Sequence, residues 1–169
     1  RSRGLGDVYK RQNLANSMKD AESVLFLGRH VGFPVALEGA LKLKEIAYLH
    51  AEGFAAGELK HGPIALIEEG QPVFVIVPSP RGRDSLHSKV VSNIQEIRAR
   101  GAITIVIAEE GDTAVEDYAN HVIRIPKAPT LMQPLLATVP LQIFAAHVAK
   151  SKGYDVDQPR NLAKSVTVE

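Results

Sequence analysis

The stretch Leu37–Pro63, LEGALKLKEIAYLHAEGFAAGELKHGP, holds most of the chemistry visible in this chain. It predicts a long helix that ends in a His-Gly-Pro turn, with an apolar stripe at Leu37, Ala40, Leu41, Ile46, Ala47 and Leu49. Glu38, Lys42 and Glu45 are spaced i, i+4 and i+7, so we expect them to share a second face about two turns long.

Two carboxylates beside a lysine can form a tunable proton carrier. The lysine favours the charged form of a neighbouring acid and the second acid disfavours it, so such a group can act as a general base. The same spacing also fits an ordinary solvated helix face, where an i, i+4 ion pair contributes only about 0.2–0.5 kcal/mol. Spacing alone leaves both interpretations open.

His61 lies between Lys60 and the turn-forming pair Gly62-Pro63. We expect it to lie outside the helix, exposed and presented by a rigid bend. A histidine in such a place can titrate near neutral pH and move a proton. It can equally be an ordinary surface histidine that precedes a turn.

Composition limits the classes of protein to consider. The chain has 169 residues, of which 45% are hydrophobic and 23% charged, so it predicts one soluble domain with one good core. The formal net charge of +1 and the aromatic content of 5% do not favour a nucleic-acid partner.

The absence of cysteine excludes disulfides and thiolate metal sites within the chain and fits a reducing compartment. The longest apolar runs, such as PVFVIVP at 72–78, are far shorter than the roughly 20 residues that span a bilayer. The N-terminus lacks the apolar stretch of a signal peptide. We therefore expect a cytoplasmic protein that contacts no membrane and holds neither a metal nor a cofactor.

Residues 1–12, RSRGLGDVYKRQ, carry four basic residues against one acid and show no helical or strand period. We interpret them as an appended tail and leave them out of the fold. Without them the chain has 16 basic and 18 acidic residues, a net charge of −2. The domain is expected at residues 13–154, followed by a polar C-terminal segment at 155–169.

Continuous apolar runs predict four buried strands, at 23–27, 72–77, 103–108 and 121–125. Besides the central helix, we expect helices at 13–20, 85–100, 112–120 and 131–152. Pro134 and Pro140 predict a kink or a late start in the last helix.

Buried strands that alternate with helices favour a doubly wound α/β fold, in which a parallel sheet is covered on both faces. In such sheets, ligands bind beyond the carboxyl ends of the strands. Gly28 and the start of the central helix are expected at that edge of the sheet.

The C-terminal segment, DVDQPRNLAKSVTVE at 155–169, is polar and lacks the apolar period of a core element. The commonest fate of such a terminus is to be mobile. Alternatively, it folds over a site and delivers Arg160 or Lys164 to it. A lysine whose pKa is lowered can form a Schiff base with a carbonyl group.

The central stretch and the C-terminal segment together closely resemble the glutamine-fructose-6-phosphate aminotransferases, also called glucosamine-6-phosphate synthases. The resemblance runs from about Asn13 to Glu169 and covers the C-terminal sugar isomerase (SIS) unit of that family. It implies a flavodoxin-like three-layer sandwich. The family joins a glutaminase domain to two SIS units that convert fructose 6-phosphate into glucosamine 6-phosphate, and this chain resembles the second unit.

The resemblance implies a role for each matching residue. Glu45 in KLKE would move a proton between C1 and C2 of the open sugar, with Glu38 and Lys42 as its partners. His61 in ELKHGP would open the sugar ring. In the family this histidine comes from the neighbouring subunit, so the active unit would be a homodimer.

Lys164 in NLAKSVTVE would engage the C2 ketone with its amine, and the adjacent Ala163 would contact the substrate. The C-terminal segment would then be a lid that carries a catalytic group. Carboxylate, lysine and histidine supply the base, the acid and the ring-opening group that a ketose-to-aldose conversion needs.

The loop Pro78–Arg83 departs from the Ser- and Thr-rich phosphate loop of the family's first SIS unit. We therefore expect residues outside this chain to hold the sugar phosphate, and Arg81 and Arg83 to be surface charges. The glutaminase domain and the first SIS unit are also missing. The expectation is a fragment of the larger enzyme that is inactive alone.

Two other interpretations stay open. A SIS unit can be a sugar-phosphate-sensing module, which the joint presence of Glu45, His61 and Lys164 disfavours. It can also belong to a related deglycase that acts on fructosamine phosphates. The intact DQPRNLAKSVTVE sequence argues against that enzyme.

Overall fold

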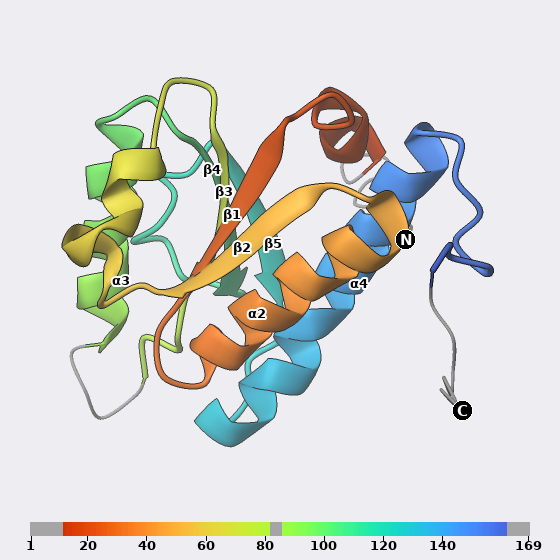
Figure 1. The fold of residues 1–169 in the computed structure, drawn as a ribbon. Helices are drawn as coiled ribbons and strands as arrows, with labels where there is room; N and C mark the ends of the chain where they lie inside the picture. Colours follow the sequence, from red (N-terminus) through yellow and green to blue (C-terminus); the bar gives the residue numbers. More distant parts are fainter. Residues whose placement is uncertain (1–11, 82–85, 162–169) are drawn as a thin grey trace, which may run out of the picture.

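A five-stranded sheet runs through the centre of the computed structural model, which describes residues 12–81 and 86–161 (Figure 1). All its strand pairs are parallel, in the order β2-β1-β3-β4-β5. The strands are Ser23–Gly28 (β1), His50–Ala55 (β2), Pro72–Ile76 (β3), Ile103–Glu109 (β4) and His121–Ile125 (β5). The four strands expected from the sequence are confirmed, and β2 is an addition.

Helices cover both faces of this sheet. Gly32–Lys42 (α2) and Gln133–Ser151 (α4) lie together on one face, and Leu86–Arg98 (α3) lies on the other (Figure 1). The expected doubly wound α/β fold is therefore confirmed. Two short 3₁₀ turns follow β2, at Leu59–His61 (η2) and Pro63–Leu66 (η3).

A separate hydrophobic cluster fills each layer, because the side chains of a buried strand point alternately to the two faces. On the α2 and α4 face, Phe26 of β1 stacks on Phe74 of β3 with 4.9 Å between ring centroids. Phe144 of α4 packs on the same Phe74 ring at 4.8 Å. On the opposite face, α3 buries Val90, Ile94 and Ile97. Burial on both faces explains why the strand sequences are continuously apolar.

The prediction of a long helix through residues 37–63 is wrong beyond the first part of that stretch. α2 passes into a π-helical turn, Leu43–Ala47 (η1), and ends at Tyr48, whose backbone is left-handed with a φ of 53°. The chain then forms β2, an edge strand that pairs with β1. Pairing with β1 outweighs the helix preference of this stretch, since tertiary contacts routinely override local propensity.

The helix expected at 112–120 is also wrong, because those residues form turns. The Asp112 carboxylate accepts a hydrogen bond from the Ala114 amide at 3.2 Å. The Asn120 side chain accepts one from the Thr104 amide at 2.9 Å. Aspartate and asparagine side chains that bond to nearby backbone groups compete with helix formation, which is the reason for the difference.

The two remaining ends of the chain largely follow expectation. Residues 12–17 are helical, where a lead-in helix was expected. α4 begins at Gln133 after a 3₁₀ turn, Thr130–Met132 (η4), so its late start is confirmed. Pro134 lies in the first turn of α4, where its missing N–H breaks no helical hydrogen bond.

Within the described ranges, Thr130–Ser151 is the one helix long and apolar enough to cross a membrane by length and composition. It packs against α2 and η1, and it buries Leu141, Phe144 and Val148 in the core cluster of that face. Through these residues the helix contributes to the hydrophobic core.

Candidate active site

Lys42 binds two carboxylates at the end of α2. Its Nζ lies 2.6 Å from Glu45 Oε2 and 3.5 Å from Glu38 Oε1. The three side chains are between 26% and 34% exposed, so they are accessible to a small molecule without being fully solvated. The expectation that they share one face is confirmed.

The local backbone explains how Glu45 reaches this position. It lies in the π-helical turn η1, and its side chain meets that of Lys42, three residues earlier. Single π turns inside helices are frequent at functional sites. The hydrogen bond to Glu45 raises the pKa of Lys42, burial lowers it, and the charge of Glu38 raises it, with a net increase above the ordinary value. Lys42 therefore presents a permanent positive charge to both carboxylates.

A pocket of about 520 Å³ lies beside Glu45. It is lined by Lys44, Glu45, Tyr48, Leu49, His50, Arg160 and Asn161. The end of the helix and the C-terminal segment therefore form one cavity, although they are far apart in the sequence. In Figure 1 the chain that follows α4 passes beside the end of α2.

This pocket lies at the opposite edge of the sheet from the one expected. α2 starts beyond the carboxyl end of β1 and runs back along the sheet, so Glu45 lies near the amino ends of β1 and β2 (Figure 1). Gly28 and the start of α2 do lie at the carboxyl edge. Residue spacing alone does not place the carboxylates at the other end, because the length of α2 relative to the sheet decides their position.

His61 is exposed and lies in η2, directly before Gly62, whose φ is 152°. The expected presentation at a bend is confirmed. Within one chain, however, His61 and Glu45 lie beyond opposite ends of β2. Its six residues alone span about 20 Å at roughly 3.3 Å per residue, so the two side chains are not brought together.

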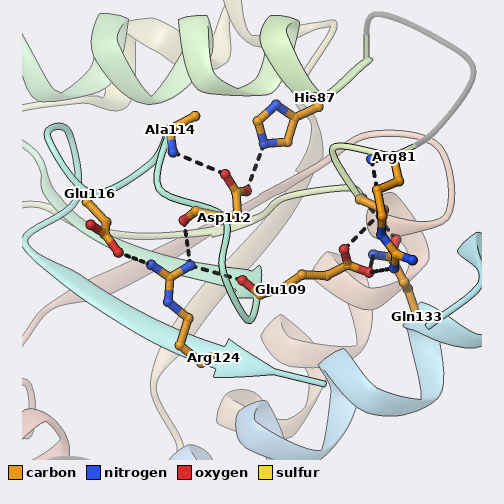
Figure 2. Close-up of polar contacts among 9 residues, drawn as sticks. Arg81, His87, Glu109, Asp112, Ala114, Glu116, Arg124 and Gln133 are labelled. Atoms are coloured by element: carbon orange, nitrogen blue, oxygen red, sulfur yellow. Dashed lines mark hydrogen bonds and ion pairs between the residues drawn. The ribbon is translucent and has the colours of Figure 1, made fainter. Parts of the chain in front are cut away.

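The carboxyl edge of the sheet is occupied by the buried carboxylate of Glu109, the last residue of β4 (Figure 2). Its side chain is 2% exposed. Glu109 accepts hydrogen bonds from Ser79 Oγ at 2.9 Å, Arg81 Nη2 at 2.9 Å, Gln133 Nε2 at 3.2 Å and the Ala128 amide at 3.3 Å. Hydrogen-bond donors that could have bound an anionic ligand thus bind a carboxylate of the protein itself.

The same network keeps Glu109 charged. Burial raises the pKa of its carboxyl, but the bonds from Arg81 and Ser79 and from the Ala128 amide lower it, and the net pKa is below the ordinary 4.5. The Arg81 side chain is 57% exposed, so the expectation that it is a surface charge is correct. Its guanidinium nevertheless binds the buried Glu109 carboxylate. Arg83 lies outside the described residues. In the sequence, Glu109 is an acidic residue directly after a predicted buried strand. That position indicated a buried carboxylate, but Glu109 was not among the expected site residues.

A second polar cluster lies beside the first (Figure 2). His87 Nε2, at the start of α3, lies 2.7 Å from Asp112 Oδ2. Arg124 of β5 donates to the backbone oxygens of Glu109 and Asp112 at 3.0 and 2.7 Å. These contacts tie the loop after β4 to its neighbours on both sides.

The SIS domain model matches residues 17–151. The chain belongs to the SIS domain family. The matched range contains the whole sheet, α2 with the Lys42 cluster, and both polar clusters of Figure 2. The SIS fold expected from the central stretch is thereby confirmed.

Two similar relatives of this SIS chain carry the same name. A glutamine-fructose-6-phosphate aminotransferase of Corynebacterium diphtheriae is 89% identical over 98% of the chain, and that of Streptomyces coelicolor is 72% identical over 99%. The chain spans 26% and 27% of the length of those two proteins.

A solved structure agrees with this relationship. The C-terminal domain of the glucosamine-fructose-6-phosphate aminotransferase from Francisella tularensis superimposes with a TM-score of 0.79 at 40% identity. The match covers 91% of this SIS chain and 42% of the other. The chain is thus similar to less than half of that C-terminal domain.

Two expected site residues, Ala163 and Lys164, lie outside the described residues of the SIS chain. Asn161, at the end of the described range, lines the pocket beside Glu45. Among the residues that the structure does describe, no group of three or more His, Cys, Asp or Glu side chains is arranged to hold a metal ion.

Proposed function

We propose that this chain is the second SIS unit of a glutamine-fructose-6-phosphate aminotransferase and carries the ketose-to-aldose isomerisation that yields glucosamine 6-phosphate. One observation carries the proposal. In a chain 89% identical to part of such an enzyme, a partly buried carboxylate, Glu45, is held by Lys42 at the wall of a pocket that the C-terminal segment helps to form.

Glu45 acts as the base that takes a proton at C1 and returns it at C2. Its position at the pocket wall gives it access to a sugar, and its hydrogen bond from Lys42 fixes its side chain there. Glu38 holds Lys42 from the other side.

Lys164 and Ala163 complete the site from the C-terminal segment, residues 155–169. Asn161 lines the pocket, and the three residues from there to Lys164 can span about 10 Å when extended. A lysine that enters the pocket can engage the C2 ketone with its amine. This reach supports the proposal that the segment closes over the sugar.

His61 opens the sugar ring in the site of a neighbouring subunit, and the functional unit is a homodimer. Its exposure and its place beyond the far end of β2 from Glu45 favour a role in another chain's site. Each active site then takes Glu45 from one subunit and His61 from the other.

The rest of the enzyme supplies what this chain lacks. The first SIS unit holds the sugar phosphate, since the donors at the carboxyl edge here are taken by Glu109. The glutaminase domain supplies ammonia. Large apolar side chains are exposed on α2, η4 and α4, at Leu37, Leu41, Leu131, Met132, Leu135 and Val139, which supports a missing partner. The fragment alone is inactive, and the whole enzyme works in the cytoplasm without a cofactor.

The test measures glucosamine 6-phosphate formation by a parent-length protein that ends in this sequence. We expect Glu45→Gln and Lys164→Ala to lower the rate by about 10²-fold or more, because each removes a proton-transfer or carbonyl-binding group. Glutaminase activity should be retained in both variants. Glu110→Gln and Lys150→Ala, at exposed positions, serve as matched controls.

Full glucosamine 6-phosphate formation in both variants would contradict the proposal. The sensing module would then be the better interpretation, and direct binding of fructose 6-phosphate without turnover would support it. Release of the amine from a fructosamine phosphate, by hydrolysis of a C1 imine that leaves an aldose 6-phosphate, would instead support the deglycase.

A further inference from the structure

Tyr48 stands at the junction between the proposed base and the C-terminal segment. It follows the π turn that contains Glu45, and it lines the same pocket. Its φ of 53° lies in the left-handed region, which a bulky residue rarely adopts. This backbone turns the chain from the end of α2 into β2.

Three contacts of the Tyr48 side chain come from the chain that follows α4. The backbone N–H of Arg160 donates a hydrogen bond to the Tyr48 hydroxyl at 2.7 Å. The Arg160 guanidinium lies over the same ring, 4.1 Å from its centroid. The ring of Tyr154 packs against it at 4.8 Å with an angle of 58° between planes. Two groups of Arg160, in the C-terminal segment, and the ring of Tyr154 just before it therefore meet one side chain.

These contacts differ from ordinary core packing. Tyr48 is only partly buried, and the hydrophobic cluster on its side of the sheet is built from other side chains, with Tyr154 packed at its margin. The hydroxyl of Tyr48 binds a main-chain N–H, so it constrains the path of the segment itself. The ring adds a cation–π contact, which is attractive even at an exposed site.

We propose that Tyr48 is a positioning residue: by binding Arg160, it anchors the C-terminal segment beside Glu45 at the pocket that both line. The inference rests on the proposed function, since it concerns the same isomerisation. Tyr48 itself transfers no proton. Tyr48 directly follows the π turn that contains Glu45. One short stretch of chain therefore carries the proposed base and also fixes the path of the C-terminal segment.

The experiment combines two readouts on the parent-length protein and its Tyr48→Phe and Tyr48→Leu variants. Trypsin cleavage after Arg160, followed by mass spectrometry of the shortened protein, reports how often the segment leaves the anchor. Glucosamine 6-phosphate formation is measured beside glutaminase activity, which shows that the separate glutaminase domain is intact, and circular dichroism with thermal unfolding checks that each variant is folded. Tyr118→Phe, which removes a tyrosine hydroxyl on the other face of the sheet, is the matched control.

Tyr48→Phe keeps the ring and loses the acceptor of the Arg160 N–H, so cleavage after Arg160 should rise about fivefold. Tyr48→Leu also loses the ring, so cleavage should rise by about tenfold or more and glucosamine 6-phosphate formation should fall by about fivefold or more. The glutaminase rate should stay unchanged in both variants. Tyr118→Phe should match the unmodified protein in every readout.

Unchanged cleavage in Tyr48→Leu would overturn the anchor. Faster cleavage with full glucosamine 6-phosphate formation would overturn its role in positioning. Glu45→Gln in the same assay separates the two proposals. If Glu45→Gln is inactive and Tyr48→Leu fully active, only the anchoring inference is wrong, whereas an active Glu45→Gln makes the proposed function itself wrong.

Discussion

Glu109 shows how the side chain of one residue can take up the hydrogen-bond donors of a potential ligand site. It ends β4 at the edge where sheets of this type commonly bind ligands, and its carboxylate collects a hydroxyl, a guanidinium, an amide and a backbone N–H. Those are the donors that an anionic group on a ligand would use. The protein's own carboxylate satisfies them, so these four donors are not free to hold a phosphate.

The lowered pKa of Glu109 predicts a pH dependence of stability. A carboxylate whose folded pKa is depressed adds stability above its unfolded value of about 4.5 and loses it as the pH falls through the lower folded value. Glu109→Gln should lower the free energy of unfolding at pH 7 by about 1–3 kcal/mol, because charged hydrogen bonds are lost at a buried position. It should also weaken the decline of stability below pH 4.5.

Urea denaturation of the chain between pH 3 and pH 7 would measure both effects, at roughly the values where carboxylates titrate. Glu110→Gln, at the neighbouring exposed position, is the control and should behave as the unmodified chain. Equal pH profiles for the two variants would mean that the Glu109 network contributes nothing to acid stability.

At the scale of elements, the close approach of α2 to its neighbours depends on Gly39. A Cβ atom added there would lie 2.8 Å from Leu141 Cδ1 of α4 and 2.8 Å from the Phe26 ring of β1. The helix that carries Lys42 and leads to Glu45 can therefore pack this closely only because residue 39 has no side chain. Its position between sheet and α4 fixes where the pocket forms.

Gly39→Ala should destabilise the chain by about 1–3 kcal/mol, because the added methyl overpacks the contact between α2, Phe26 and Leu141. This sign is opposite to the gain of about 1 kcal/mol that helix propensity alone predicts. Chemical denaturation of the variant gives the answer. The double variant Gly39→Ala with Leu141→Ala should lose less stability than the two single changes combined, since the clash is relieved.

At the scale of the whole molecule, Glu45 and His61 belong to opposite ends of one sheet edge. In the proposed homodimer, each site takes one of these groups from each subunit, so two residues that are distant within one chain can serve the proposed reaction. The proposal therefore needs no fold that brings the exposed His61 to Glu45 of its own chain.

Mixing two inactive variants tests this arrangement. Parent-length Glu45→Gln and His61→Ala proteins, dissociated and reassociated together, should regain about a quarter of the normal rate of glucosamine 6-phosphate formation. Half the dimers are then mixed, and one of the two sites in each mixed dimer has both groups intact. No recovery despite proven subunit exchange would place both groups in the same chain's site.

Features that depend on neighbouring residues could be predicted from the amino-acid sequence. The buried strands could be predicted because continuous apolar runs reflect burial on both faces. The shared face of Glu38, Lys42 and Glu45 follows from helical spacing. The exposed bend at His61 and the late start of α4 follow from proline and glycine chemistry within a few positions.

Only the tertiary structure decided the features that join distant parts of the chain. β2 forms because β1 offers it a paired edge, against the helix preference of its own residues. The Glu109 network and the contact between Tyr48 and Arg160 each join groups whose separation in sequence carries no periodic signal. Local propensity acts over a few residues, whereas strand pairing and side-chain contacts depend on how the whole chain packs.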